Sequence, residues 1–176
     1  MKASVNYNIV LIGMMGTGKS SVAAALSRMT GLPSFDTDAV FRSRYGSISA
    51  WFADKGETAF REKETEIVRE ASAVCPAIIS TGGGVVLRGE NMRELRRLGK
   101  VALLTASPET IYARTCKNNE RPLLKNNSVS DIIRIFEERK ALYLMYADIT
   151  VDTDNDPPER CAEKILELLK SDRTFR

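Results

Sequence analysis

The 176-residue sequence contains no histidine, only three cysteines and no apolar run long enough to span a membrane. The absence of histidine excludes any mechanism with an imidazole base and argues against zinc sites of the usual Cys/His kind. The cysteines are Cys75, Cys116 and Cys161, and no two of them form a closely spaced pair. The apolar run near the N-terminus is too short for a secretory signal peptide. We therefore expect a cytoplasmic protein without a membrane segment.

A concentrated charge of one sign is also missing. There are 26 Lys and Arg against 23 Asp and Glu, and the formal net charge is +3. The densest basic stretch, RELRRLGK at 93–100, is more typical of the solvated face of a helix than of a nucleic-acid surface. With 43% hydrophobic residues the chain has enough apolar material for a core. We predict a single domain over residues 1–176, monomeric, that binds a small anion and no nucleic acid.

Short apolar runs alternate with helical patterns along the chain. Strands are predicted at 8–13, 34–38, 77–81, 101–105 and 148–153. Helices are predicted at 19–30, 38–45, 50–55, 57–74, 90–98, from 108, at 131–147 and from 157. Apolar strands that alternate with helices predict a three-layer α/β/α fold around a five-stranded parallel sheet. Ligands of such sheets bind beyond the C-terminal ends of the strands.

One segment departs from this alternation. KNNERPLLKNNS at 117–128 is polar, rich in asparagine and without a clean period. A connection of this length between two helices is often a mobile lid. Arg121 lies within it, and a lid arginine can close over phosphates to neutralise transition-state charge. Simple exposure of a loop arginine is the alternative.

A phosphate-binding pattern follows the first predicted strand. GMMGTGKS, from Gly13 to Ser20, fits G-x-x-x-x-G-K-[ST] and opens a predicted helix. Its glycines let backbone N–H groups surround phosphates, while Lys19 reaches the terminal phosphates. The Ser20 hydroxyl is suited to ligate Mg²⁺. The pattern therefore predicts a P-loop that binds a nucleoside triphosphate.

Two other interpretations of the same residues stay open. Gly16 and Gly18 give G-x-G-x-x-S, and Asp36 follows twenty residues after Gly16, which resembles a dinucleotide fingerprint. The third glycine of that fingerprint is missing, however. A glycine-rich turn without any ligand is the remaining possibility.

Two carboxylates follow the second apolar run, in SFDTDAVF. Asp36 and Asp38 are two residues apart, so on a strand they would point to the same side, toward the cleft above the P-loop. Two unpartnered carboxylates there would repel each other. We predict that Asp36 binds Mg²⁺ through water and that Asp38 accepts a hydrogen bond from the attacking hydroxyl of a second substrate. A helix cap at Asp38 is the alternative.

An arginine interrupts the apolar stripe of the helix predicted at 131–147. The stripe contains Ile135, Phe136 and Tyr143, and the 3.6-residue period places Arg139 among them. A guanidinium group in apolar surroundings needs an anionic or polar partner. Either a protein carboxylate neutralises it permanently, or it lines a cleft that receives an anionic ligand.

A second arginine has acids on both sides. Glu57 and Glu64 are four residues before and three residues after Arg61, which is typical of a solvated ion-pair ladder. Glu64 lies on the apolar face of its helix, however, and that favours a carboxylate that orients the arginine. Further along, TGGGVV places three glycines, Gly82–Gly84, at a strand end, where a ligand can touch the backbone. A loose turn is the alternative there.

Taken together and in this order, the motifs GMMGTGKS, DTD, GETAFREKE, STGGGVV, ERPLL and RKALY resemble those of the shikimate kinase family over nearly the whole chain. The resemblance implies the fold of nucleoside monophosphate kinases. It also implies phosphorylation of the 3-hydroxyl of shikimate by MgATP, in the pathway to chorismate and aromatic amino acids. ATP and shikimate are the expected small-molecule substrates, and Mg²⁺ is the expected cofactor.

The resemblance also assigns roles. It implies catalytic roles for Lys19, Asp38 and Arg121. It implies that ATP is bound by Gly16, Thr17, Gly18, Lys19, Ser20, Ser21, Arg114 and Arg121, with Arg114 packed on adenine. It implies that shikimate is bound by Asp38, Phe52, Phe60, Arg61, Gly82, Gly83, Gly84 and Arg139. The metal would be held by Ser20 and, through water, by Asp36.

The sequence departs from the family pattern at two places, and two alternative functions remain. Ala141 stands where the family often has proline, and TDNDPPE at 153–159 is acidic where relatives often place a basic residue against adenine. One rival function is a related kinase for gluconate or a nucleoside monophosphate, which would share the P-loop. The other is a nucleotide-dependent switch, although the guanine-specific N-K-x-D motif is absent.

Overall fold

The computed structural model describes residues 5–116 and 128–171. Its strands are β1 (Asn8–Ile12), β2 (Ser34–Asp36), β3 (Ile78–Ser80), β4 (Gly99–Thr105) and β5 (Ile149–Asp152). Its α-helices are α1 (Lys19–Thr30), α2 (Thr37–Tyr45), α3 (Ile48–Ala73), α4 (Gly89–Arg97), α5 (Pro108–Thr115), α6 (Val129–Tyr146) and α7 (Pro158–Ser171). A short 3₁₀ turn, η1, covers Val85–Leu87. None of the helices in the described ranges combines the length and the apolar character needed to cross a membrane.

The five strands form one parallel sheet in the order β2-β3-β1-β4-β5. β1 lies at the centre, where Ile9 pairs with Ile78 on β3 and with Lys100 on β4. Parallel strands bring all their C-terminal ends to one edge of the sheet. The P-loop after β1, Asp36 at the end of β2 and the glycine turn after β3 therefore meet at that edge, as the sequence analysis predicted.

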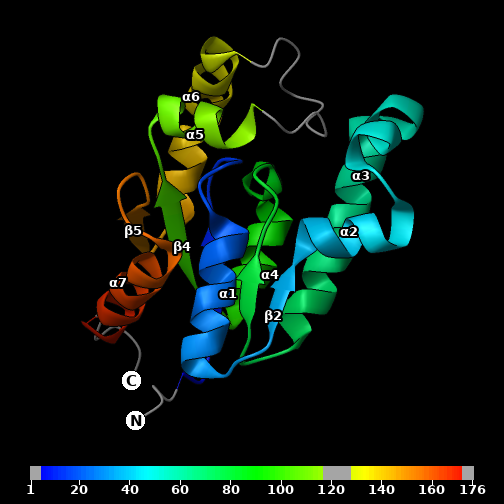
Figure 1. The fold of residues 1–176 in the computed structure, drawn as a ribbon. Helices are drawn as coiled ribbons and strands as arrows, with labels where there is room; N and C mark the ends of the chain where they lie inside the picture. Colours follow the sequence, from blue (N-terminus) through cyan, green and yellow to red (C-terminus); the bar gives the residue numbers. More distant parts are fainter. Residues whose placement is uncertain (1–4, 117–127, 172–176) are drawn as a thin grey trace.

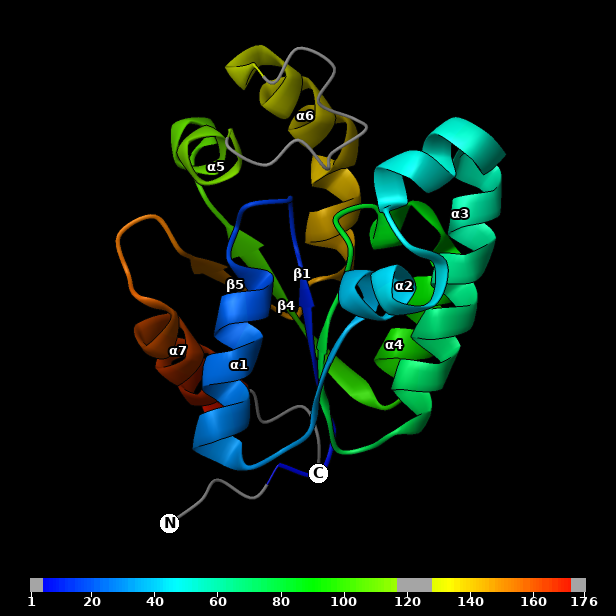
Figure 2. The ribbon, with the colours of Figure 1, turned by 45° about the vertical axis from the view of Figure 1, so that its right-hand side comes forward.

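Helices cover both faces of the sheet, as Figures 1 and 2 show. The alternating side chains of β1 explain the three layers. Ile9 and Leu11 pack with buried residues of α1 and α7, while Val10 and Ile12 pack with buried residues of α3, α4 and α6. β1 is covered on both faces and every one of its residues is buried. Its sequence is therefore a continuous apolar run after Asn8, without alternating polar residues. The predicted three-layer α/β/α fold is confirmed.

Local signals set several helix ends where they were predicted. α1 spans Lys19–Thr30, and Gly31 ends it with φ 79°, its N–H donating to the Ser27 carbonyl. α5 begins at Pro108 behind Ser107, whose hydroxyl accepts a hydrogen bond from the Thr110 N–H at 3.2 Å.

The second strand is shorter than predicted. β2 ends at Asp36, and Thr37 already belongs to α2. Asp36 is the N-cap of that helix, because its Oδ1 accepts a hydrogen bond from the Ala39 N–H at 3.0 Å. The argument that Asp36 and Asp38 share one side of a strand is therefore wrong, and so is a cap at Asp38. Asp38 lies in the first turn of the helix that Asp36 caps.

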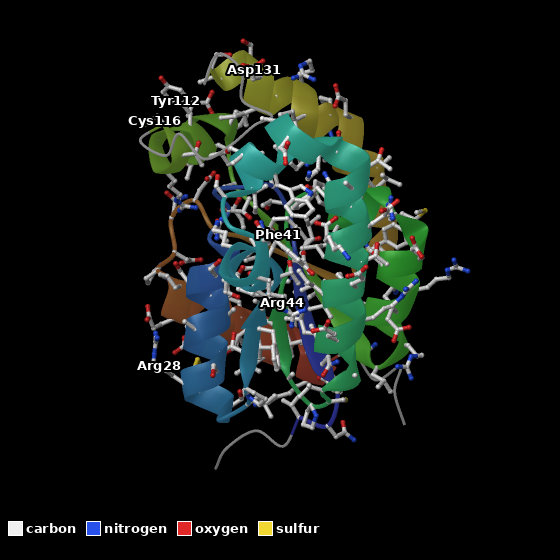
Figure 3. All side chains as sticks on the ribbon, turned by 90° about the vertical axis from the view of Figure 1, so that its right-hand side faces the viewer. Arg28, Phe41, Arg44, Tyr112, Cys116 and Asp131 are labelled. Atoms are coloured by element: carbon white, nitrogen blue, oxygen red, sulfur yellow. The ribbon has the colours of Figure 1, made fainter. Side chains whose placement is uncertain are left out.

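A separate aromatic cluster joins α2 to α3. Phe41, Phe60 and Ile67 are its buried members, with Trp51 and Phe52 packed against them. Figure 3 looks onto these two helices from outside and labels Phe41 on α2. Within α3 the backbone of Gly56 is not helical, with φ 80° and ψ 172°. This break agrees with the two helices predicted on either side of residue 56.

Candidate active site

A pocket of about 310 Å³ opens at the C-terminal edge of the sheet; we call it the main pocket. The P-loop, the ends of β2 and β3, α2, α3 and α6 all contribute to it. Its lining includes most of the predicted site residues: Gly16, Gly18, Lys19, Ser20, Ser21, Asp36, Asp38, Phe52, Phe60, Arg61, Gly82, Gly83, Gly84 and Arg139. The fold therefore gathers residues that are more than a hundred positions apart in the sequence.

The P-loop places a lysine ammonium group against its own backbone. Gly18 precedes α1 in a left-handed conformation, with φ 86°, which costs glycine little and other residues more. Lys19 begins the helix, and its Nζ donates hydrogen bonds to the carbonyl oxygens of Gly13 at 2.9 Å and of Met14 at 2.7 Å. The positive charge and the N-terminus of α1 thus meet at one place, which suits an anion.

Two residues predicted to bind the nucleotide, one within the P-loop and one on α5, do not line the main pocket. The Thr17 side chain is buried and donates to the Met14 carbonyl at 2.8 Å. Arg114, on α5, donates to the Gly16 carbonyl at 3.3 Å and to the Thr153 carbonyl at 2.7 Å. Arg114 therefore joins the P-loop to the segment after β5. Arg121 and most of the predicted lid lie outside the described residues.

Asp36 links α1, β2 and β3 through one carboxylate. Its Oδ2 accepts hydrogen bonds from the Ser20 hydroxyl at 2.5 Å and from the Ser80 hydroxyl at 3.2 Å. Its other oxygen caps α2, as described above. The carboxylate therefore has a fixed position beside the P-loop serine.

The oxygen atoms of Ser20 and Asp36 fit a magnesium ion. Both are hard ligands, they are hydrogen-bonded to each other, and both residues line the main pocket. Among residues 5–116 and 128–171, no three acidic or cysteine side chains converge to hold a metal by themselves. Mg²⁺ in phosphoryl-transfer sites commonly takes one or two protein oxygens and completes its shell with phosphates and water. The donor set is that of a nucleotide-bound ion.

Two carboxylates lie against the glycine turn. An ideal Cβ on Gly82 would lie 2.7 Å from Asp38 Oδ1 and 3.0 Å from Glu64 Oε1. Burial raises the pKa of the Glu64 carboxyl above its usual value, while the Arg61 guanidinium opposes the rise and the Asp38 charge adds to it. Glu64 Oε1 is buried and has no hydrogen-bond partner in the part of the chain that the structure describes. The turn therefore lies beside two carboxylates at Gly82 and beside the Arg61 guanidinium at Gly84.

Arg61 is held from both sides and is nearly removed from solvent. Its Nη1 lies 2.8 Å from Glu64 Oε2 and its Nη2 lies 3.0 Å from Glu57 Oε1. The exposed fraction of its side chain is 8%, and that of Glu64 is 3%, so the solvated ladder is wrong. The pair of carboxylates orients the guanidinium, as the other interpretation proposed.

The glycine turn is packed and hydrogen-bonded, so the alternative of a loose turn is wrong. The Gly82 N–H donates to the Thr37 hydroxyl at 3.1 Å, and the Gly83 carbonyl accepts from the Tyr143 hydroxyl at 2.5 Å. A Cβ on Gly84 would lie 2.2 Å from Arg61 Nη2, a distance that side chains do not tolerate. Only glycine allows the Arg61 guanidinium to lie flat against this backbone.

Arg139 lies on α6, 5% exposed, and lines the main pocket. The structure records no ion pair between its guanidinium and any carboxylate of residues 5–116 and 128–171. An ideal Cβ on Gly83 would lie 3.8 Å from its Nη1. Permanent neutralisation by a protein carboxylate is thus not what the described chain shows. A buried cation that faces a cavity favours an anionic ligand.

Apolar side chains also line the main pocket. The rings of Phe52 and Phe60 are 4.9 Å apart between centroids, tilted by 45°. Arg42 and Ile48 also line the pocket, and the sequence analysis did not find them. Arg42 is four residues after Asp38 on α2, so the spacing was a usable signal. Its direction became clear only once α2 was placed in the fold.

Comparison with known proteins identifies close relatives. The family model described as shikimate kinase matches residues 15–170. A shikimate kinase from Nitrosococcus oceani is 38% identical over 168 residues, covering 94% of this chain and 88% of the relative. A shikimate kinase from Enterococcus faecalis is 40% identical over 166 residues, covering 93% and 98%.

Solved structures of shikimate kinases also resemble this chain. The shikimate kinase from Acinetobacter baumannii in complex with shikimate superposes with a TM-score of 0.92 at 30% identity, covering 97% of this chain and 96% of that one. A gluconokinase from Sinorhizobium meliloti reaches a TM-score of 0.62 at 17% identity, a likeness of fold alone.

Proposed function

This chain belongs to the shikimate kinase family and transfers a phosphoryl group from ATP to shikimate, and we propose that the main pocket is where the transfer takes place. The observation that supports this location best is the joint presence of a P-loop lysine and a buried arginine without an ion-pair partner among the described residues. The first suits the phosphates of one substrate and the second suits the carboxylate of the other.

The nucleotide side of the site uses backbone and lysine. The N–H groups of the P-loop and the N-terminus of α1 bind phosphate oxygens, with Gly16, Thr17, Gly18 and Ser21 forming the cradle. The Lys19 ammonium group, held by the carbonyl oxygens of Gly13 and Met14, neutralises charge on the transferring phosphoryl group. Arg114 holds the P-loop to the segment after β5 and offers its guanidinium face to the base. Arg121 lies outside the described residues, and its contact with the ATP phosphates stays a prediction from the sequence.

Ser20 and Asp36 would hold Mg²⁺ beside the phosphates, Asp36 through water. When bound, the ion neutralises charge on the phosphate oxygens and orients them. The hydrogen bond between the two side chains keeps both oxygens in place before the nucleotide binds.

The acceptor side of the site orients a hydroxylated acid. Arg139 and Arg61 bind the carboxylate, and Phe52 and Phe60 contact the apolar edge of the ring. Asp38 accepts a hydrogen bond from the 3-hydroxyl and aims its oxygen at the phosphoryl group, with the glycine turn beneath. Positioning and charge neutralisation supply most of the rate in such a transfer, because its transition state is loose. A cytoplasmic location and a monomeric state remain predictions from the sequence.

An acceptor panel tests this assignment. We expect shikimate to raise MgATP-dependent ADP release by more than about a hundredfold over the acceptor-free rate, because binding the acceptor supplies positioning. Gluconate and AMP should leave the rate near background, since AMP has no carboxylate for Arg139 and gluconate has no ring to pack against Phe52 and Phe60. A coupled ADP assay measures all three. Faster turnover of gluconate or AMP would contradict the proposal, as would nanomolar nucleotide affinity without turnover.

Gly84→Ala tests the close packing of Arg61 on the glycine turn. The new Cβ would lie 2.2 Å from Arg61 Nη2, so the guanidinium must move and the pair with Glu64 must break. We expect the KM for shikimate to rise about tenfold, with a lower Tm, because a buried charge loses its partner. The control is Gly89→Ala, whose Cβ would meet only the Tyr146 hydroxyl, at 3.4 Å. Wild-type KM in the Gly84 variant would show that Arg61 does not bind the acceptor.

A further inference from the structure

The hydroxyl of Tyr143 connects two parts of the main pocket without lining it. Tyr143 is 1% exposed and lies on α6, four residues and about one helical turn after Arg139. Its hydroxyl donates to the Gly83 carbonyl at 2.5 Å, across 60 residues of sequence. Its ring packs in the core that α6 shares with the sheet. The bond therefore runs from the helix that carries Arg139 to the turn that carries the three glycines.

The acceptor of this bond lies where the parts of the site meet. An ideal Cβ on Gly83 would be 3.4 Å from the Met15 N, on the P-loop side, and 3.8 Å from Arg139 Nη1. Gly83 is thus enclosed between the phosphate-binding loop and the guanidinium. A shift of Gly83 therefore changes its distance to the P-loop and to the Arg139 guanidinium.

The bond also sets the direction of a backbone donor. In a trans peptide the C=O and the following N–H point in opposite directions. Because the Gly83 carbonyl faces Tyr143, the Gly84 N–H faces away from it. Among the described residues, no recorded hydrogen bond uses the N–H of Gly83 or of Gly84, and both residues line the main pocket. Two backbone donors are therefore available to a ligand at this turn.

The hydroxyl stays protonated over the physiological range. Burial raises the pKa of Tyr143 above its usual value, although the nearby Arg139 charge opposes the rise. A buried tyrosine hydroxyl needs a partner, and many carbonyl groups would satisfy that need. Here the partner is the carbonyl of Gly83, in the glycine turn that lines the main pocket.

We propose that the Tyr143 hydroxyl is a positioning group for the acid substrate. Its hydrogen bond fixes the glycine turn and Arg139 relative to each other before that substrate binds. The inference rests on the proposed function, because it requires the turn and Arg139 to bind the same molecule. Tyr143 itself does not touch the substrate.

Tyr143→Phe tests the proposal, with Tyr146→Phe as the matched control. Both changes remove one hydroxyl from α6, but the Tyr146 hydroxyl has no recorded hydrogen bond in the described chain. For Tyr143→Phe we expect the KM and Kd for shikimate to rise about five- to tenfold, the range of one buried hydrogen bond. The kcat and the KM for ATP should stay within about twofold, and Tyr146→Phe should leave all values within about twofold.

Two readouts separate positioning from mere stability. Steady-state kinetics give the KM values, and the fluorescence of the single tryptophan, Trp51, reports shikimate binding without ATP because its neighbour Phe52 lines the main pocket. A lower Tm with unchanged KM and Kd would overturn the proposal. If the variant is unstable at 25 °C, the titration is repeated at about 10 °C, where native proteins are commonly near their greatest stability. Failure to fold there too would count as a structural role and against the proposal.

The same experiment distinguishes failure of the inference from failure of the proposed function. In the Arg139→Ala background, Tyr143→Phe should add less than about twofold to the KM, because the group that it positions is already gone. Additive effects would contradict the coupling. If the wild type released no ADP in response to shikimate, or if Arg139→Ala were silent, the proposed function itself would fail. If only Tyr143→Phe were silent, the positioning role alone would fail.

Discussion

Replacing Lys19 with alanine is expected to lower kcat by about three orders of magnitude, the size found when a preorganised donor to a developing charge is removed. The ammonium group is held at the head of the P-loop by the Gly13 and Met14 carbonyls. It is therefore in place before the reaction and needs little reorganisation to follow the phosphoryl group. The KM for ATP should change by less than about tenfold, since the backbone N–H groups of the loop remain.

Single-turnover kinetics at saturating ATP and shikimate measure this effect directly. Lys19→Arg is the control, because it keeps the positive charge while changing its geometry. We expect it to recover part of the lost rate. A Lys19→Ala enzyme with kcat within about tenfold of the wild type would show that the charge on the phosphoryl group is stabilised elsewhere.

Arg139→Ala is expected to raise the KM for shikimate about a hundredfold, with kcat within about threefold. The Arg139 guanidinium is buried and has no carboxylate partner among the described residues, so its removal should change the stability of the substrate-free enzyme little. The complex of the variant with shikimate lacks two charge-assisted hydrogen bonds to the substrate carboxylate, and each is worth about 1.5–3 kcal/mol. The loss therefore falls on binding of the acid and not on the transfer.

The measurement is a full kinetic matrix in both substrates, with Trp51 fluorescence as the check on binding. Arg139→Lys should recover only part of the affinity, because an ammonium group cannot reproduce the planar fork. The KM for ATP is the internal control and should not move. Should both parameters stay within about twofold of the wild type, the carboxylate role would be wrong.

The features that the sequence predicted well are those that short-range patterns determine. The strand, glycine loop and lysine-serine pair are continuous in sequence, so the P-loop needed no tertiary information. The buried position of Arg139 followed from the period of one helix. In both cases the deciding contacts lie within one element or two adjacent ones, where spacing alone is informative.

The features that it missed depend on contacts between distant segments. The end of β2 was placed two residues late because Asp36 caps α2, and cap geometry outweighs the strand preference of the preceding residues. The burial of Arg61 depends on how α3 packs on the glycine turn. The place of Arg42 in the pocket lining depends on the orientation of α2, and the hydrogen bond of Tyr143 joins residues 60 positions apart.

The aromatic cluster between α2 and α3 shares no buried residue with the two cores that flank the sheet. Phe52 and Phe60, which we propose to contact the acceptor, thus belong to a module of their own beside the scaffold that carries the P-loop. During divergence such a module can be remodelled around a new alcohol while the strand order and the phosphate loop are inherited unchanged.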